Sequence, residues 1–293
     1  MIAFDERVYA ISRKHFGKFK DEETKEEENL FHYTSSFGLN SIIVNHNLWF
    51  SHINYLNDKG ESVYTYKLLK KRLEKLRNSI NRDLYNELNE KCDGISSEDY
   101  FVASFSTDQD NLSNWNYYTK SKNTTGYNIG FDKNTLISTM NYNYETFHEK
   151  TIYEEKTQAT ILDELIIDYN SMFETLGYNL EIVQNINNDI KILSLFFKHP
   201  SFYAEKEYRI VICRSRNLKF HKVDNDKFRI HNGIFIPYIE QNFSPESVVS
   251  VTISPTQKQS LVKSSVEKFL KEYGYNVQNN ENFVKTSEIP LRY

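Results

Sequence analysis

The stretch that decides the fold is KHPSFYAEKEYRIVI, residues 198–212. It follows a long amphipathic helical region, turns at Pro200, and then alternates as a β-strand would. The alternation predicts that Glu205, Glu207 and Arg209 share one face of the strand. Buried charges are costly unless they are paired or act on a substrate, so this strand is a candidate carrier of an active-site acid. An edge strand with a solvated charged face would show the same pattern.

Composition narrows the class of protein. The 293 residues carry a formal net charge of -4, which gives no global electrostatic case for nucleic-acid binding. Glycine is scarce, at 9 residues, and neither the GxGxxG nor the P-loop pattern occurs, which argues against those phosphate sites. The two cysteines, Cys92 and Cys213, lack CxxC spacing, so no structural zinc site is expected. Without a membrane-length apolar run or a signal-peptide pattern, we expect a cytoplasmic protein with no membrane contact.

Hydrophobic periodicity predicts an α+β fold, namely a single mixed domain with a central, mainly antiparallel sheet and flanking helices. Strands are expected at 30–35, 47–51, 100–106, 126–131, 151–153, 205–212, 228–230, 235–238 and 248–253. Helices are expected at 36–45, 62–90 with a break near Asn81, 115–118, 158–176, 181–197 and 256–273. The rest of 133–155 has no regular pattern. We expect residues 1–29 to form an N-terminal helical extension and 30–293 to form one domain, with a helical insertion around 156–197.

Four polar clusters lie at or just after predicted strands, where a rigid backbone can hold catalytic or binding groups. They are His32/Tyr33/Thr34, Asn57/Asp58/Glu61, Ser104/Ser106 with Trp115/Tyr118, and Glu205/Glu207/Arg209. Each cluster also has a structural interpretation: a hydrogen-bonded histidine, a capped turn, a half-exposed strand with core aromatics, and an edge strand. The sequence has no GxSxG and no HExxH pattern, and its histidines are scattered, so no metal site is predicted.

The order of these segments resembles a bacterial family named domain of unknown function 2971. The resembling segments are FHYTS (31–35), LWFS (48–51), LND (56–58) with Glu61, SFS (104–106), Trp115 with Tyr118, Gly130-Phe131, Lys198, EKEYR (205–209) and SEIPLR (287–292). The resemblance covers nearly the whole chain from residue 30. It implies little about activity, because the family is named for lacking an assigned one.

A more distant likeness is to ADP-ribosyltransferases, whose core opens with a strand bearing His or Arg, then a helix and a short strand. A later strand of that core supplies Ser or Tyr, and a still later one supplies Glu, often as Glu-x-Glu. The segments 32–34, 104–106 and 205–207 are similar to these three elements. The likeness departs at two points. A helix is inserted before the Ser-x-Ser strand, and Asn57-Asp58 has no obvious counterpart.

This likeness implies an enzyme that consumes NAD as its substrate without a metal, and that modifies a protein or nucleic-acid acceptor as a toxin or antiphage defence effector. It is also compatible with binding of this chain to a partner protein of a defence or toxin system. The implied catalytic residues are Glu207, Glu205 and His32. The implied binding residues are Tyr33, Thr34, Asn57, Asp58, Ser104, Ser106, Trp115, Tyr118 and Arg209. Two alternatives stay open: a metal-dependent nuclease or other hydrolase using Asp58, Glu61, Glu205 and Glu207, and a non-enzymatic ligand- or partner-binding module.

Overall fold

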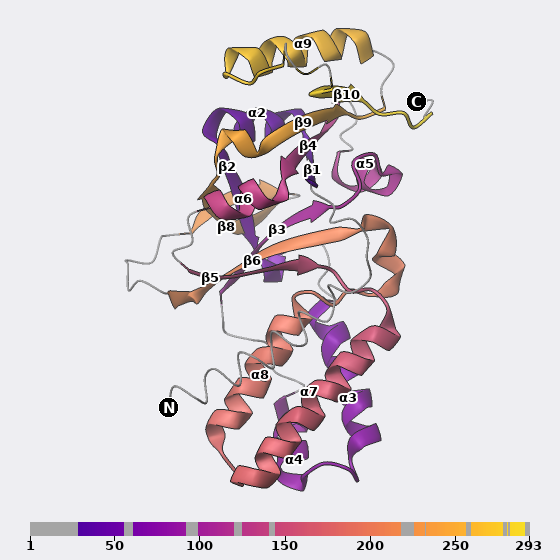
Figure 1. The fold of residues 1–293 in the computed structure, drawn as a ribbon, viewed down its shortest axis with the longest axis vertical. Coiled ribbons are helices and arrows are strands. Elements are labelled where there is room, and N and C mark those ends of the chain that lie inside the picture. Colours follow the sequence, from indigo (N-terminus) through magenta and orange to yellow (C-terminus); the bar gives the residue numbers. More distant parts are fainter. Residues whose placement is uncertain are drawn as a thin grey trace. The chain divides into compact units, whose positions relative to one another are not determined.

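The structure is a computed structural model that describes residues 29–55, 61–91, 99–119, 125–140, 144–217, 226–231, 233–255, 259–277, 280 and 282–290 (Figure 1). The chain divides into two compact units. The helical unit draws its described residues from 61–91 and 149–203, and the sheet unit draws its own from 29–55, 99–148 and 204–290. Residues 1–28, where the N-terminal extension is expected, lie outside the described residues.

The described part of the helical unit contains the helices α3 (Glu61–Leu76), α4 (Arg82–Lys91), α7 (Glu155–Leu176) and α8 (Leu180–Ser194). Apolar side chains at helical spacing on all four pack into one buried cluster. Arg72 on α3 also pairs with Asp163 on α7, with 2.7 Å between Nε and Oδ1. The predicted break near Asn81 is confirmed, because its side-chain oxygen accepts from the Asp83 backbone N–H at 2.8 Å, at the start of α4. The helices predicted at 158–176 and 181–197 therefore share a core with residues 61–91.

The sheet unit is built on ten strands among the described residues. They are β1 (Asn29–Ser35), β2 (Asn47–His52), β3 (Tyr100–Ser106), β4 (Gly126–Asp132), β5 (Tyr144–Lys150), β6 (Glu207–Asn217), β7 (Lys227–His231), β8 (Ile234–Asn242), β9 (Val248–Ile253) and β10 (Val284–Thr286). The main path runs β10-β9-β4-β1-β3-β2-β8-β7, and its pairs are antiparallel except β9–β10. The α+β class with a mainly antiparallel sheet is thus confirmed.

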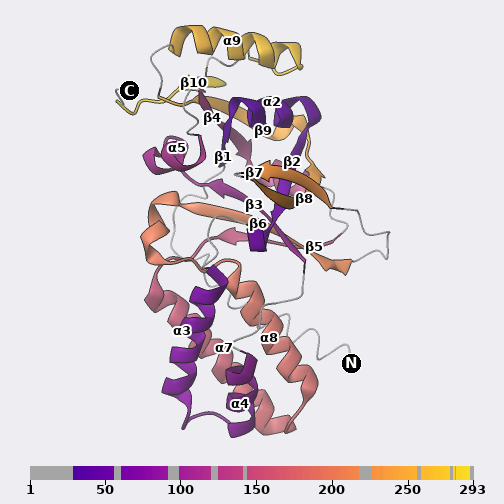
Figure 2. The same ribbon diagram turned by 180° about the vertical axis from the view of Figure 1, so that it is seen from behind.

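Strand β3 is the branch point of this sheet. One edge of β3 pairs with β6 over its whole length, from Tyr100↔Cys213 to Ser106↔Glu207, and β6 in turn pairs with β5. The other edge pairs with β2 near Val102 and with β1 at Ser106. Two half-sheets therefore diverge from β3, namely β1-β4-β9-β10 and β2-β8-β7 (Figure 2). We call the point on β3 between these two pairings the fork.

The two faces of the sheet differ in chemistry, because successive strand residues point to opposite sides. The core face carries a cluster that includes Phe105, Ile129 and Ile210, and the helices α2 (Ser36–Asn45), α6 (Lys133–Thr139) and α9 (Gln259–Glu272) add apolar residues to it. The polar face carries Ser104, Ser106, Glu207 and Arg209, which the β3–β6 register places together. The helix α5 (Leu112–Tyr118) lies on this polar face, where Trp115 packs against Phe31 and Tyr33.

Three sequence predictions of local structure are wrong in this part of the chain. Residues 133–155 are not mainly irregular, because they contain α6 and β5, and the predicted strand at 151–153 is reduced to an isolated bridge from Ile152 to Phe197. Helix α6 starts because Asp132 accepts from the Thr135 backbone N–H at 2.7 Å and caps it. The helix predicted to begin at Trp115 begins at Leu112 instead, since Asn111 is its N-cap.

Candidate functional site

The turn before β6 sets the directions of the two glutamates. Residues Pro200–Glu205 form a 3₁₀ helix, and Lys206 then adopts a left-handed conformation with φ of 47°. Such a conformation is unusual for a residue with a Cβ, and it interrupts the alternation that an extended strand would give. The strand starts at Glu207. The prediction that Glu205 lies on one strand face with Glu207 and Arg209 is therefore wrong for Glu205.

Glu207 and Arg209 do share a face, and they form a buried ion pair. Arg209 donates from Nε to Glu207 Oε1 at 2.9 Å and from Nη2 to Oε2 at 3.0 Å. The two side chains are 5% and 1% exposed. This two-bond geometry satisfies both carboxylate oxygens and fixes the plane of the carboxylate. Because each charge compensates the other, the pair can stay ionised in a place where a lone carboxylate would be costly.

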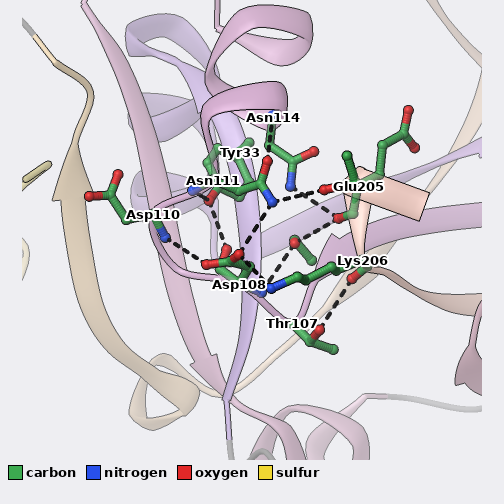
Figure 3. Close-up of polar contacts among 10 residues, drawn as sticks. Tyr33, Thr107, Asp108, Asp110, Asn111, Asn114, Glu205 and Lys206 are labelled. Carbon is green, nitrogen blue, oxygen red and sulfur yellow. Dashed lines mark hydrogen bonds and ion pairs between the residues drawn. The ribbon is translucent and has the colours of Figure 1, made fainter. Parts of the chain in front are cut away.

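The loop at residues 107–111, which follows β3, is joined to the turn before β6 by a polar network (Figure 3). Ser106 Oγ donates to the Glu205 carbonyl at 2.8 Å, and the Thr107 backbone N–H donates to the Lys206 carbonyl at 2.9 Å. Lys206 Nζ lies 3.0 Å from Asp108 Oδ2. Although burial alone raises the pKa of Asp108, the hydrogen bond and charge of Lys206 lower the pKa of that carboxyl below its usual value.

Two asparagines extend this network from the start of α5. Asn111 Nδ2 donates to the Ala204 carbonyl at 2.8 Å, and Asn114 Nδ2 donates to the Glu205 carbonyl at 3.1 Å. The side-chain oxygen of Asn111 also accepts from the Asn114 backbone N–H and caps the helix. In the part of the chain that the structure describes, the buried Asn114 Oδ1 has no hydrogen-bond partner. Tyr118, from the same helix, reaches Glu205 Oε2 at 3.4 Å.

The aromatic residues predicted to bind substrate hold the loop in place. The Tyr33 hydroxyl donates to the Asp108 carbonyl at 2.7 Å and accepts from the Asn111 backbone N–H at 2.8 Å. Burial raises the pKa of this hydroxyl far above its ordinary value, so Tyr33 stays protonated at neutral pH. Trp115 meets the Tyr33 ring edge to face at 4.7 Å between centroids and donates to Asp110 Oδ1 at 2.6 Å. Both rings therefore have structural partners on the polar face.

His32 lies on the other face of the sheet. Its register with Ile129 on β4 places it on the core face, where its ring packs edge to face on Phe105. His32 Nδ1 donates to the Ser104 carbonyl at 3.1 Å, on the edge of β3 at the fork. Burial, and then the charge of Arg229, lower the pKa of His32 below its usual value. Strand alternation places Thr34 on the same face as His32. The structure thus brings Ser104, Ser106, Trp115, Tyr118, Glu205, Glu207 and Arg209 to the polar side, and sets the side chains of His32 and Thr34 apart from them.

Two predicted site residues cannot be placed, and four residues of the polar network were not predicted. Asn57 and Asp58 lie outside the described residues. Sequence reasoning missed Asp108, Asp110, Asn111 and Lys206, although a run of polar residues directly after a strand was a signal for the first three.

Within the described ranges, no group of three or more His, Cys, Asp or Glu side chains could hold a metal ion. No helix in the described part of the chain has the length and apolar character needed to cross a membrane.

Comparison with known families agrees with part of the sequence resemblance. Residues 114–210 match the family model described as protein of unknown function (DUF2971). The chain carries a DUF2971 family domain over these residues. The DUF2971 match includes α5 from Asn114 onward and the start of β6, with Glu205, Glu207 and Arg209, and it does not include β1 with His32. No curated protein and no solved structure gives a significant match, and none of the comparisons supports a relation to ADP-ribosyltransferases.

Proposed function

We propose that the chain is a cytoplasmic enzyme that consumes NAD and transfers ADP-ribose to a protein or nucleic-acid acceptor, as a toxin or antiphage effector. The observation that carries this proposal is the adjacency of β1, β3 and β6. These strands hold the three sequence elements similar to the transferase core, and they are neighbours in the sheet although they come from distant parts of the sequence. Phe31, Ser106 and Glu207 pair directly across them in one row.

The proposed reaction needs one well-oriented carboxylate. The bond between nicotinamide and C1′ of its ribose breaks, and nicotinamide leaves with the electron pair. The positive charge that develops on the ribose is stabilised by Glu207, which accepts a hydrogen bond from the ribose 2′-hydroxyl. A nucleophilic atom of the acceptor then forms the new bond to C1′ and loses its proton. Arg209 serves as a positioning residue, because it fixes the plane of the Glu207 carboxylate.

The geometry agrees with the acceptor-orienting role that the resemblance implied for Glu205, and it changes the role of His32. Glu205 lies in the turn beside Tyr118, off the strand face, and this supports a role in orienting the acceptor. His32 points to the core face and bonds to the Ser104 carbonyl, which supports a positioning role at the fork in place of contact with ribose. Because Glu207 is buried, the proposal also requires a local opening around this carboxylate before NAD can bind.

Nicotinamide release from NAD tests the proposal. We expect the purified chain to release nicotinamide in the presence of a chelator, and Glu207→Gln to reduce this rate by about 100-fold or more, as for the loss of a transition-state charge contact. Glu246→Gln, at an exposed glutamate, is the matched control and should keep the full rate. Glu205→Gln should retain nicotinamide release but lose transfer to an acceptor. Thermal melts of each variant separate loss of activity from loss of folding.

Two outcomes of this experiment contradict the proposal. Absence of nicotinamide release from the folded wild-type chain would exclude NAD consumption under those conditions. Equal release by the wild type and Glu207→Gln would remove Glu207 from the reaction. Turnover that requires a divalent metal and attacks RNA or DNA would favour the hydrolase alternative instead.

A further inference from the structure

The half-sheet β2-β8-β7 carries an arginine that forms no ion pair with any residue that the structure describes. Arg229 on β7 is partly buried, and its Nη2 donates to Ser51 Oγ on β2 at 3.1 Å. Within the residues that the structure describes, no carboxylate pairs with Arg229. The one acid in the β8 sequence, Glu240, lies 2.6 Å from Lys227 and is paired with it. Arg229 thus keeps most of its guanidinium N–H donors for another partner.

Among the described residues, the other arginines that are buried or half-buried all have acidic partners. Arg72 pairs with Asp163, Arg209 pairs with Glu207, and Arg214 pairs with both Asp99 and Asp226. Removing a guanidinium from water costs free energy, and the ion pairs with these acids offset that cost. Burial lowers the pKa of Arg229, as expected for a cation removed from water without such an acid, yet arginine stays charged at neutral pH. An anionic group from outside the described chain would supply the missing charge.

Two stacked aromatic rings lie on the sheet face that carries this arginine. Trp49 on β2 stacks on Tyr238 of β8, with ring centroids 4.4 Å apart and an angle of 25° between the planes. Tyr238 pairs directly with Ser51, the residue that Arg229 contacts. Trp49 is 40% exposed, so part of its ring is open to a second flat group. A cation and an exposed indole on one sheet face, on either side of Ser51 and Tyr238, suit a phosphate attached to a nucleoside.

The position of Arg229 and Trp49 along the sheet suits the binding of a dinucleotide. Ser51 pairs with Val102 on β3, while Glu207 pairs with Ser106 on the same strand. Val102 and Ser106 are four residues apart on the polar face, so the two rows are separated by about 13 Å. A dinucleotide in an extended conformation spans a distance of this order between its two nucleosides.

We propose that Arg229, Ser51 and Trp49 bind the phosphate-bearing, adenosine end of a nucleotide ligand. The guanidinium contacts the phosphate oxygens, the Ser51 hydroxyl adds a hydrogen bond, and the Trp49 ring stacks on the base. This inference rests on the proposed function, since it places the ADP half of NAD on the half-sheet that lies across the fork from β1. The nicotinamide ribose then extends along β3 toward Glu207.

Tryptophan fluorescence offers a direct binding assay. The chain has 2 tryptophans, and Trp115 is 1% exposed, so quenching by an added ligand reports on Trp49. We expect ADP-ribose and ADP to quench the emission with a saturating curve, and adenosine, which lacks phosphate, to bind at least about tenfold more weakly. Arg229→Gln should weaken ADP-ribose binding by about tenfold or more, and Arg229→Lys should lie between Arg229→Gln and the wild type. Arg82→Gln, at an exposed arginine of α4, controls for the lost charge.

The outcomes separate this site from the proposed reaction. ADP-ribose binding that depends on Arg229, without nicotinamide release, supports the site and contradicts the transferase. Nicotinamide release with an unchanged KM for NAD in Arg229→Gln supports the transferase and overturns the site. Equal affinity for adenosine and ADP, or no binding of any of these probes by calorimetry, also overturns the site.

Discussion

Asp110 connects the 107–111 loop to the end of the described chain, and its loss is the sharpest test of how the site is held. One carboxylate oxygen accepts from Trp115 Nε1 at 2.6 Å and from Ser287 Oγ at 2.7 Å. The other oxygen accepts from the Glu288 backbone N–H at 2.8 Å. Trp115 and Ser287 are buried, so their donors cannot turn to water when the carboxylate is removed. The family-like ending at 287–292 thus has a structural role at Ser287 and Glu288.

The expected cost follows from these three bonds. A hydrogen bond to a charged group contributes about 1.5–3 kcal/mol, and a buried donor without a partner costs about 1–3 kcal/mol. Because the three bonds share one carboxylate and are not additive, we expect Asp110→Ala to lower the free energy of unfolding by about 3–5 kcal/mol. Asp110→Asn keeps one acceptor oxygen but presents an N–H to Glu288, so it should cost about 1–2 kcal/mol. Glu288→Ala keeps the backbone donor and should stay within about 0.5 kcal/mol of the wild type.

Urea unfolding followed by tryptophan fluorescence measures these costs. Trp49 and Trp115 both belong to the sheet unit, so the signal reports the transition of that unit. A cost below about 1 kcal/mol for Asp110→Ala, or equal costs for Asp110→Ala and Asp110→Asn, would refute the assignment of Asp110 as the anchor of the loop.

Three further predictions concern stability. Lys206→Gly should be more stable than Lys206→Ala by about 1 kcal/mol, because both variants lose the contact with Asp108 but only glycine adopts the left-handed backbone freely; equal urea midpoints would contradict this. The His32 side chain has a lowered pKa in the folded state, so the unfolded state binds more protons below pH ~6.5 and stability should fall there as the pH falls. In His32→Gln that part of the loss should disappear, and parallel profiles for the two proteins would count against it. Tyr169→Phe removes a 2.8 Å hydrogen bond to buried Asp189 and should cost about 1–3 kcal/mol, whereas no change in thermal or urea unfolding would show that Asp189 is satisfied without it.

Strands with clear alternation could be predicted from the sequence, because their side chains alternate between a packed core and another environment. The strand at 100–106 is observed with the predicted bounds, and β1, β2, β4 and β9 differ from prediction by a residue or less. Strand β5 was missed because its burial does not alternate: after Tyr144, its next three residues are all half-buried. Strand β5 forms because it pairs with β6, which is distant in the sequence. No pattern within residues 144–150 reveals such a partner.

The sequence singled out most residues of the candidate site but did not predict the direction of every side chain in it. The Glu207–Arg209 face followed from strand alternation, and the pair is buried as a charged pair must be. The direction of Glu205 did not follow, because a lysine at φ of 47° has no sequence signal of the kind that glycine provides. His32 and Tyr33 were grouped as neighbours in sequence, although neighbours on a strand point to opposite faces. Arg229 could not be found from the sequence, because only the structure shows which acids are already paired.

The branch at β3 also bears on how the chain is made. Ser106 and its hydrogen-bond partner Glu205 are 99 positions apart, so one edge of β3 waits for β6 during synthesis. At about 5–20 residues per second, that wait lasts roughly 5–20 seconds on the ribosome. An unpaired strand as apolar as YFVASFS is a template for wrong pairing during such a delay. We therefore expect newly made chains to depend on chaperones that shield β3, and slower translation between residues 107 and 206 to increase aggregation.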